Sequence, residues 1–284
     1  MKQAMIFAAG LGTRLKPLTD TMPKALVSVG GQPLLQHVVF RLRDAGFSRL
    51  VVNVHHFSQQ IKDYLQANDS FGLDIRVSDE TAALLDTGGG LRKAAPLFDA
   101  HRPILIHNVD ILSNVDLARF YALDPRVACP DCGVPHRMAG AQLLVSWRRT
   151  RRYLLFDDRM LLVGWVNVET GEVKSPYPEV ARVAASVRWP LAVGDAPMRL
   201  AGLYRMYAFS GIHSFSPLFF PYMAAWPERF AIMDFYLRHC REVPVKGHVK
   251  PDLQLMDVGK LGTLDAAEAF AQQLDHQHQI HHNT

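Results

Sequence analysis

Short apolar runs alternate with helical patterns along the first half of the chain, and this alternation restricts the fold more than any other feature. The runs at residues 3–9, 49–54 and 103–108 are mainly apolar, as buried strands of a parallel sheet are. Between the first two runs, Pro33 opens a helical pattern and Gly46 ends it. We therefore predict βαβ units and a mostly parallel α/β sheet flanked by helices.

The second half has a different pattern. Runs at residues 142–147, 153–156 and 160–168 are separated by turn residues, which predicts hairpins that either extend the sheet or form a flap. The elements expected after them are a partly helical excursion between Pro176 and Pro197, a strand at 200–209, a helix at 230–240, a strand at 253–256, and a helix at 263–274.

Composition excludes several classes of protein. The chain has 284 residues, 49% of them hydrophobic and 20% charged, which permits one or two full domains and excludes disorder. A net charge of +4 is too small to indicate nucleic-acid binding. Three cysteines do not form a disulfide scaffold, so we expect a cytoplasmic protein. The uncharged stretch at 206–227 contains several prolines, which favours strand, turn and short helix over a membrane span.

A glycine-rich loop, Gly10-Leu11-Gly12-Thr13-Arg14, directly follows the first expected strand, and Lys24 comes soon after it. Glycines at the end of a strand let backbone N–H groups approach and surround an anion. Arg14 and Lys24 add two cations. Leu15 stands where a dinucleotide-binding loop has its third glycine, and the P-loop pattern is also absent. We therefore predict a phosphate-binding loop of another kind; the alternative is an ordinary βα turn.

These residues resemble the signature of the sugar-1-phosphate nucleotidyltransferases, the NDP-sugar pyrophosphorylases. The resemblance runs through nearly the whole chain, at residues 10–14, 23–26, 31–35, 86–90, 108–110, 209–212 and 256–259. The triple glycine Gly88-Gly89-Gly90 is most similar to that of the N-acetylmuramate-1-phosphate uridylyltransferases and the short mannose-1-phosphate guanylyltransferases.

The resemblance implies a nucleotide-diphospho-sugar transferase fold, a Rossmann-like, mostly parallel sheet flanked by helices with a hairpin-rich insertion. Because its motifs run from residue 10 to residue 259, we predict a single domain over residues 1–284, with a nucleotide half at 1–128 and a sugar and second-metal half at 129–275. The histidine-rich residues 276–284 are expected to form a frayed tail. The implied reaction is Mg²⁺-dependent transfer from a nucleoside triphosphate to a sugar-1-phosphate with release of pyrophosphate. We expect no nucleic-acid or membrane partner, and the sequence does not predict the oligomeric state.

Several functions remain open within and beyond this family. UTP with N-acetylmuramate-1-phosphate is preferred over GTP with mannose- or heptose-1-phosphate. A glycosyltransferase is disfavoured because Asp110-Ile111-Leu112 lacks the second aspartate of Asp-x-Asp. A catalytically silent nucleotide-binding regulator is the third alternative.

The resemblance also implies roles for individual residues. Asp110 and Asp257 correspond to the metal ligands, Arg14 faces the leaving pyrophosphate, and Lys24 faces the phosphates at the reaction centre. The implied nucleotide-binding residues are Ala9, Gly10, Gly12, Thr13, Arg14, Lys24, Thr87, Gly88, Gly89 and Asn108, of which residues 87–89 read the base edge. The resemblance implies a sugar-binding role for Gly211, and Arg152 of the arginine cluster is a separate candidate for contact with an anionic sugar or phosphate.

The sequence departs from the family at two places. Val109 replaces a glycine that usually precedes the first metal aspartate, and the Glu-Lys-Pro motif that holds the sugar in many relatives is absent. Trp165-Val166-Asn167 stands near the expected place of that motif.

Three other clusters have simpler interpretations. Arg148, Arg149, Arg151 and Arg152 alternate between the faces of a predicted hairpin, which favours a solvated surface over a nucleic-acid patch. Cys129 and Cys132 with His136 supply too few ligands for a zinc site. The tail histidines, at positions 276, 278, 281 and 282, are expected to be disordered.

Overall fold

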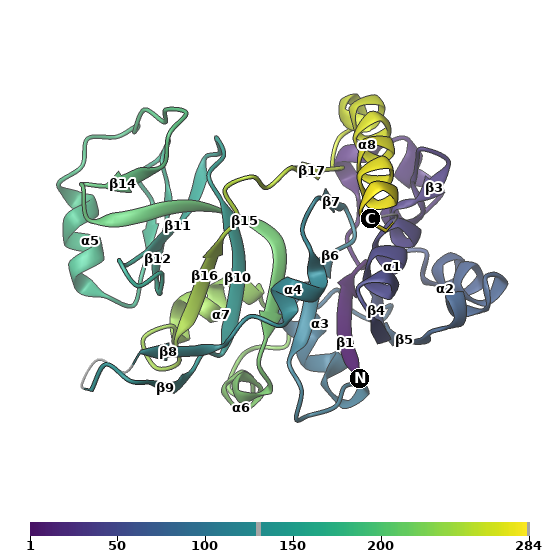
Figure 1. The fold of residues 1–284 in the computed structure, drawn as a ribbon, viewed down its shortest axis with the longest axis horizontal. Coiled ribbons are helices and arrows are strands. Elements are labelled where there is room, and N and C mark those ends of the chain that lie inside the picture. Colours follow the sequence, from purple (N-terminus) through teal and green to yellow (C-terminus); the bar gives the residue numbers. More distant parts are fainter. Residues whose placement is uncertain (129–131, 283–284) are drawn as a thin grey trace. The chain divides into compact units, whose positions relative to one another are not determined.

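A computed structural model describes residues 1–128 and 132–282 (Figure 1). The chain divides into two compact units. The first unit contains Met1–Ala122 and Leu253–Thr284, and the second contains Leu123–Asp252.

The first unit is built on a parallel sheet in the order β6-β1-β4-β5. Its strands are β1 (Lys2–Phe7), β4 (Phe47–Val54), β5 (Asp74–Asp79) and β6 (Ile104–Asn108). Ile6 of β1 lies between Val52 of β4 and His107 of β6. The predicted parallel sheet is confirmed, and its central strands are apolar because both of their faces are buried.

Helices flank this sheet (Figure 1). They are α1 (Leu34–Asp44), α2 (Ser58–Ala67), α3 (Asp86–Ala94) and the short α4 (Leu117–Tyr121). Helix α1 buries Leu35, Val39 and Leu42, which share one helical face. Gly46, at φ 80°, ends the α1 turn by donating its N–H to the carbonyl of Arg43 at 2.8 Å, as the sequence predicted.

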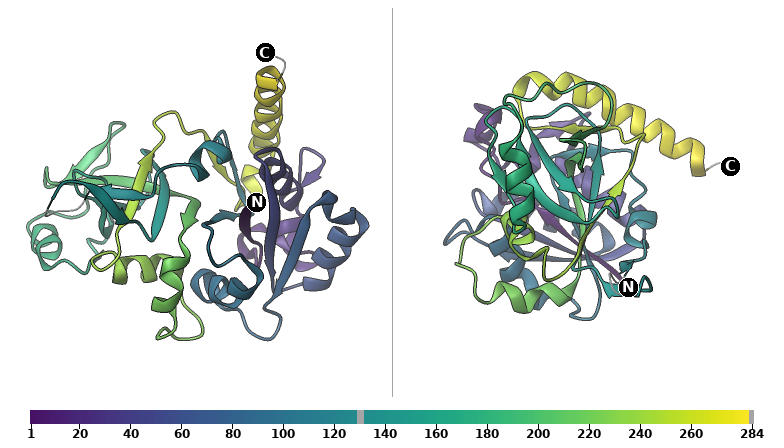
Figure 2. Two further views of the ribbon diagram at one scale, coloured as in Figure 1. Left: turned by 60° about the horizontal axis from the view of Figure 1, so that its bottom comes forward. Right: turned by 90° about the vertical axis from the view of Figure 1, so that its left-hand side faces the viewer.

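Two small ribbons and a long helix complete the first unit. The ribbons pair β2 (Ser28–Val29) with β3 (Gln32–Pro33), and β7 (Ile111–Ser113) with β17 (Leu255–Asp257). Helix α8 (Leu264–His282) buries Ala267, Ala271 and Leu274 along one face and reaches beyond the rest of its unit in both views of Figure 2. The sequence predicted that this helix ends at Leu274 and that a frayed tail follows. Up to His282 this prediction is wrong, because the helical backbone continues to that residue.

The second unit is rich in antiparallel strands, which confirms the predicted hairpin-rich region. Strands β13, β12, β11 and β15 lie in that order, β10 and β14 also pair with β15, and β16 pairs with β10. The strands are β8 (Arg126–Ala128), β9 (Pro135–Met138), β10 (Ala141–Ser146), β11 (Arg152–Phe156), β12 (Leu162–Asn167), β13 (Val173–Lys174), β14 (Met198–Leu200), β15 (Tyr204–Phe215) and β16 (Val245–Val249).

Helices α5 (Pro178–Ala185), α6 (Phe220–Met223) and α7 (Ile232–His239) belong to the second unit. Val180 and Ala184 of α5 pack with Tyr153, Leu155 and Val166 of the hairpin in one apolar core. The excursion at 176–197 is therefore partly helical, as predicted, and its helix covers the β11–β12 hairpin.

The strand predicted at residues 200–209 is shifted. Leu200 ends β14, and Ala201 (φ 49°) and Gly202 (φ 74°) form the turn that leads into β15. Two left-handed residues in succession reverse the chain, so the predicted single strand is a hairpin turn followed by a longer strand. None of the helices in the described part of the chain is long and apolar enough to cross a bilayer. The prediction of one functional domain stays a prediction.

Candidate phosphate and metal site in the first unit

The predicted phosphate and metal residues gather at the carboxyl ends of the parallel strands in the first unit. Gly10–Thr13 follow β1, and Asn108 and Asp110 lie at and just after the end of β6. The carboxyl ends of parallel strands open at one edge of a sheet, which is where α/β proteins bind ligands. The site is therefore assembled from several loops at this edge.

Gly12 is required by the backbone of the glycine-rich loop. Its φ is +63°, and a Cβ there would lie 2.8 Å from Cγ2 of Thr19. The Thr19 hydroxyl donates to the carbonyl of Gly12 at 2.9 Å, and the amide of Leu15 donates to the same carbonyl at 2.8 Å. Around Gly10, by contrast, a Cβ would meet no atom within 4 Å. The loop is thus fixed on the Gly12 side and open at Gly10.

Lys24 and Asp110 form an ion pair with each other. Lys24 begins a short 3-10 turn (Lys24–Leu26), and its side chain is 10% exposed, while that of Asp110 is 19% exposed. Charges removed from water interact more strongly than exposed charges do. The structure therefore brings together the predicted catalytic cation and the first predicted metal ligand, both largely shielded from solvent.

Asp257 lies on the strand paired with β7, next to Asp110. It is opposite Ile111 in the ribbon, and the following amide, of Val258, donates to the carbonyl of Asp110 at 2.8 Å. A Cβ on Gly259 would lie 2.7 Å from both Oδ1 of Asp257 and Nη2 of Arg14. Glycine at this position leaves room for the carboxylate and the guanidinium to lie side by side.

These carboxylates fit a small hard cation. Mg²⁺ is commonly held by one or two carboxylates together with substrate phosphates and water. The described residues contain no cluster of three or more His, Cys, Asp or Glu side chains placed to hold a metal. Asp110 and Asp257 therefore match a cation that receives its remaining ligands from phosphate, whereas an ion bound wholly by protein would need more ligands.

Thr87, Gly88 and Gly89 lie in the first turn of α3. The preceding residue, Asp86, has a φ of 61°, and its carboxylate accepts the N–H of Thr87 at 2.6 Å. Gly88 and Gly89 are buried within the helix. The expected base-reading segment is thus the start of a helix, where the first amides have no carbonyl partner in the helix itself.

A buried hydrogen-bond chain connects this helix to the glycine-rich loop, and the sequence did not predict it. Oδ1 of Asn53 accepts the N–H of Ala8 at 2.8 Å, and its Nδ2 donates to Oε1 of Glu80 at 2.7 Å. The other oxygen of Glu80 accepts the N–H of Leu85 at 3.2 Å. A Cβ on Gly90 would lie 2.6 Å from that first oxygen of Glu80, so the third glycine makes room for the chain.

Asn53 and Glu80 are nearly inaccessible to solvent, and burial raises the pKa of Glu80. The signal available in the sequence was the single polar residue in the apolar run at 50–54. A buried amide in a central strand needs partners, and those partners come from elements distant in sequence.

Val109 occupies the place of the family's glycine with its side chain buried. Its amide donates to the carbonyl of Phe7 at 3.2 Å, and Asn108 pairs with Phe7 in the sheet. Ala9 is also buried. The valine side chain therefore packs in the core beside Asp110, the first predicted metal ligand.

The two expected sugar-binding residues belong to the second unit. Gly211 has a φ of 79° inside β15, opposite a register shift in the pairing with β10. A bulge of this kind favours glycine for backbone reasons. Arg152 lies exposed at the start of β11. Their roles toward a sugar stay predictions.

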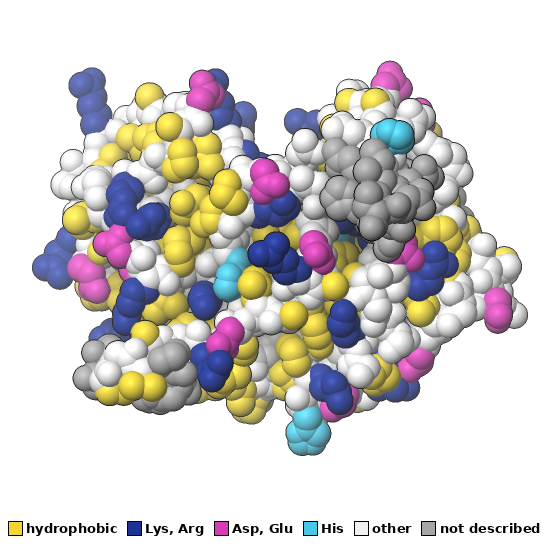
Figure 3. Space-filling view, viewed as in Figure 1, with side chains coloured by type: hydrophobic (Ala, Val, Ile, Leu, Met, Phe, Trp, Pro, Cys, Tyr) yellow, Lys and Arg dark blue, Asp and Glu magenta, His cyan; other side chains and the backbone are white. Residues whose placement is uncertain are grey.

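The arginine cluster of the second unit makes ordinary surface contacts. Arg149 pairs with Asp195 at 2.8 Å, Arg151 pairs with Glu169 at 2.9 Å, and Arg148 donates to the carbonyl of Phe209 at 2.8 Å. Basic and acidic side chains are interspersed over the face in Figure 3. Cys129 and the side chain of His136 lie outside the described residues, as do the side chains of the tail after His276.

Comparison with known proteins shows which sequences this chain is similar to. Residues 3–124 match the nucleotidyl transferase family model. N-acetylmuramate alpha-1-phosphate uridylyltransferase of Neisseria meningitidis is 43% identical over 114 residues, which are 40% of this chain and 49% of that protein. Mannose-1-phosphate guanyltransferase of Kluyveromyces lactis is 33% identical over 124 residues, 42% of this chain and 34% of that protein. The chain thus spans at most about half the length of these curated relatives.

The fold extends the likeness beyond the matched segment. The crystal structure of HddC from Yersinia pseudotuberculosis complexed with GMP-PN is 18% identical and superimposes with a TM-score of 0.65, over 95% of this chain and 99% of that one. At this identity the likeness shows the fold alone. The chain therefore has the nucleotide-diphospho-sugar transferase fold, and its residues 3–124 are similar to the nucleotidyl transferase family model.

Proposed function

We propose that this chain transfers a nucleotidyl group from a nucleoside triphosphate to a sugar-1-phosphate and releases pyrophosphate. The observation that carries the proposal is the Lys24–Asp110 ion pair at the carboxyl ends of the parallel strands, with Asp257 on the neighbouring strand and Arg14 beside it. Cations and carboxylates together at such an edge suit a metal–phosphate substrate.

The proposed reaction needs positioning more than proton transfer. An oxygen of the sugar phosphate attacks the α-phosphorus in line, a new P–O bond forms, and the bond from the α-phosphorus to the pyrophosphate oxygen breaks. The attacking oxygen is already ionised at neutral pH, so no general base is required. Preorganised charge and alignment then supply the rate enhancement.

Each residue has a distinct task in this proposal. The loop at Gly10–Thr13 presents backbone amides to the phosphates, Lys24 stabilises charge where they meet, and Arg14 holds the departing pyrophosphate. Asp110 and Asp257 would hold Mg²⁺, which when bound supplies neutralising charge on the phosphate oxygens. Lys24 would exchange part of its contact with Asp110 for contact with substrate.

For the substrates, we propose UTP and N-acetylmuramate-1-phosphate. Support comes from the triple glycine at the start of α3 and from the 43% identity to the Neisseria meningitidis uridylyltransferase. GTP with mannose-1-phosphate is the second candidate, because the Kluyveromyces lactis guanyltransferase is 33% identical over a similar segment.

A substrate panel tests both levels of the proposal. The whole chain is incubated with each of UTP, GTP, CTP and ATP against N-acetylmuramate-, mannose- and glucose-1-phosphate, with and without Mg²⁺, and pyrophosphate is measured. We expect the fastest release from UTP with N-acetylmuramate-1-phosphate and Mg²⁺. The fastest release from GTP with mannose-1-phosphate would correct the substrate, and no pyrophosphate from any pair would refute the activity.

A further inference from the structure

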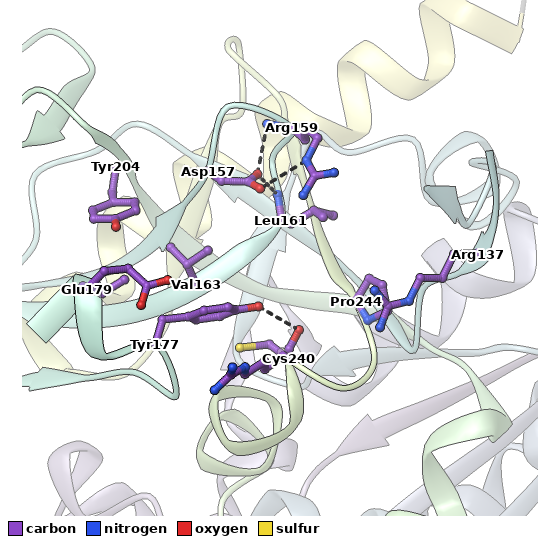
Figure 4. A pocket seen from close by; sticks show the side chains of 12 residues that line it. Arg137, Asp157, Arg159, Leu161, Val163, Tyr177, Glu179, Tyr204, Cys240 and Pro244 are labelled. Atoms are coloured by element: carbon purple, nitrogen blue, oxygen red, sulfur yellow. Dashed lines mark hydrogen bonds and ion pairs between the residues drawn. The ribbon is translucent and has the colours of Figure 1, made fainter. Parts of the chain in front are cut away.

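The second unit contains a pocket whose residues the proposed function does not use. Its volume is about 260 Å³, and it lies between the β11–β12 hairpin, the start of α5, β15 and the segment after α7 (Figure 4). A water molecule takes up roughly 30 Å³, so the pocket has room for on the order of ten non-hydrogen atoms. This is the size of a small metabolite.

One end of the pocket combines aromatic rings with a carboxylate. Figure 4 shows Tyr204, Glu179 and Tyr177 together on one side. The Tyr177 hydroxyl donates to the carbonyl of Cys240 at 3.5 Å, which holds its ring at the wall. Glu179 has no ion pair with any described residue. Aromatic faces beside a carboxylate are the surroundings that an ammonium group prefers.

The other side of the pocket is basic. Arg137 lies beyond Pro244 in Figure 4 and donates to the backbone carbonyl of Glu242. Arg241 also lines the pocket and makes no ion pair or hydrogen bond with a described residue. Arginine binds carboxylate and phosphate groups through its planar set of donors. This side is therefore suited to an anion.

The two remaining charged groups are already engaged with each other. The Asp157 carboxylate accepts the backbone amides of Arg159 at 2.9 Å and Leu161 at 2.8 Å, and it pairs with the Arg159 guanidinium at 3.4 Å. These bonds shape the turn at the rim. The charged groups left to contact a ligand are thus Glu179 on one side, Arg137 on the other, and Arg241, which is close enough to Tyr177 to interact electrostatically with it.

We propose that this pocket binds a small zwitterion. Its ammonium group lies between Tyr177, Tyr204 and Glu179, and its carboxylate or phosphate group lies against Arg241 and Arg137. Glu179 would repel a purely anionic ligand, and the arginines would repel a purely cationic one. Only a molecule with both charges therefore interacts favourably with all of these groups. This inference is independent of the proposed function.

Isothermal titration calorimetry on the whole chain tests the proposal with two zwitterions, phosphoethanolamine and 4-aminobutyrate. Inorganic phosphate and ethanolamine serve as the single-charge controls. We expect at least one zwitterion to bind with a Kd of about 1 mM or tighter, and each control to bind at least about tenfold more weakly. The comparison of the two zwitterions distinguishes phosphate from carboxylate recognition.

Substitutions then locate the ligand. Arg241→Ala and Glu179→Gln should each weaken zwitterion binding by about tenfold or more, the scale of one charge-assisted hydrogen bond. Arg229→Ala and Glu228→Gln, two exposed positions of the same unit outside the pocket, should leave the affinity unchanged. Circular dichroism of each variant checks that it is folded.

Three outcomes would overturn the proposal. The first is that neither zwitterion binds, and the second is that phosphate or ethanolamine alone binds as tightly as the zwitterions. The third is that binding persists in both pocket variants or is lost in Lys24→Ala. Loss of binding in Lys24→Ala would show that the ligand binds in the first unit.

Discussion

Two sets of buried polar groups, one in each unit, differ in whether they have hydrogen-bond partners. In the first unit, Lys24 pairs with Asp110, and Asn53 and Glu80 join one hydrogen-bond chain. In the second unit, both ring nitrogens of His213 and the hydroxyl of Tyr236 are buried without a hydrogen-bond partner in the described structure. The rings of these two residues pack edge to face with centroids 5.6 Å apart, so they serve as core side chains.

This difference indicates which buried polar side chains are held in fixed orientations. A buried polar group with partners has a defined orientation, and a site needs defined orientations before substrate arrives. A buried imidazole without partners contributes volume and loses hydration. The phosphate chemistry is therefore expected to depend on the polar groups of the first unit, and the stability of the second unit on its apolar packing.

The largest expected effect is that of Asp110→Asn, which removes the carboxylate while keeping the shape. Turnover should fall by about 10²-fold or more, the scale for one preorganised electrostatic group. Asp252→Asn removes an exposed carboxylate that also pairs with a lysine, Lys250, from the second unit and should leave turnover unchanged. Pyrophosphate release measures both. Equal turnover in the two variants would break the contrast between the units.

Gly12→Ala comes next. Alanine at φ +63° costs about 1–2 kcal/mol, and its Cβ would also collide with Thr19. We expect a lower free energy of unfolding and at least about tenfold lower turnover, because the phosphate loop must shift. Gly10→Ala adds the same methyl group where no atom lies within 4 Å, and should preserve stability. Urea unfolding and initial rates compare the pair; identical losses would contradict the loop geometry.

Glu80→Gln tests the hydrogen-bond chain. An amide in place of the carboxylate points a donor at either Asn53 Nδ2 or the amide of Leu85, so one buried bond is lost. The free energy of unfolding should fall by about 1–3 kcal/mol. The Michaelis constant for the nucleotide should rise as the start of α3 loses its anchor. If the variant is destabilised but its Michaelis constant for the nucleotide is unchanged, the Asn53–Glu80 hydrogen bonds do not contribute to nucleotide binding.

His213→Leu should have the smallest effect at neutral pH, with a free energy of unfolding unchanged or raised by up to about 1 kcal/mol. Burial lowers the pKa of His213 from 6.5 to about 3. The unfolded chain therefore binds this proton more readily, and the wild type loses stability as the pH falls from 6.5 toward 3.

The leucine variant lacks that loss, so its advantage should grow toward acidic pH. Unfolding curves at several pH values measure the difference between the two proteins. A variant much less stable than the wild type at neutral pH would show that His213 has a polar role, and the contrast between the units would have to be revised.

Sequence reasoning predicted the parts of the molecule that depend on local pattern. Continuous apolar runs identified the parallel strands, and glycine at positions 12 and 46 marked backbone that needs positive φ. Arg14, Lys24 and Asp110 could be singled out because each stands within a motif of the family that the sequence resembles.

What the sequence did not predict depends on contacts between distant segments. The Asn53–Glu80 chain joins Asn53 of β4 to residues that follow β1 and β5 and to the residue that precedes α3, and no spacing rule relates them. The start of β15 was missed because the left-handed turn at Ala201 contains no asparagine or aspartate signal. The pocket of the second unit likewise brings together residues from 137 to 244.

The most direct test of the account is pyrophosphate release by the Lys24→Ala variant, measured beside Lys250→Ala. Both lysines pair with an aspartate, Lys24 in the first unit and Lys250 at 2.9 Å in the second. The account predicts turnover reduced about 10²-fold or more in Lys24→Ala and unchanged in Lys250→Ala. Near-normal turnover in a folded Lys24→Ala protein would contradict it.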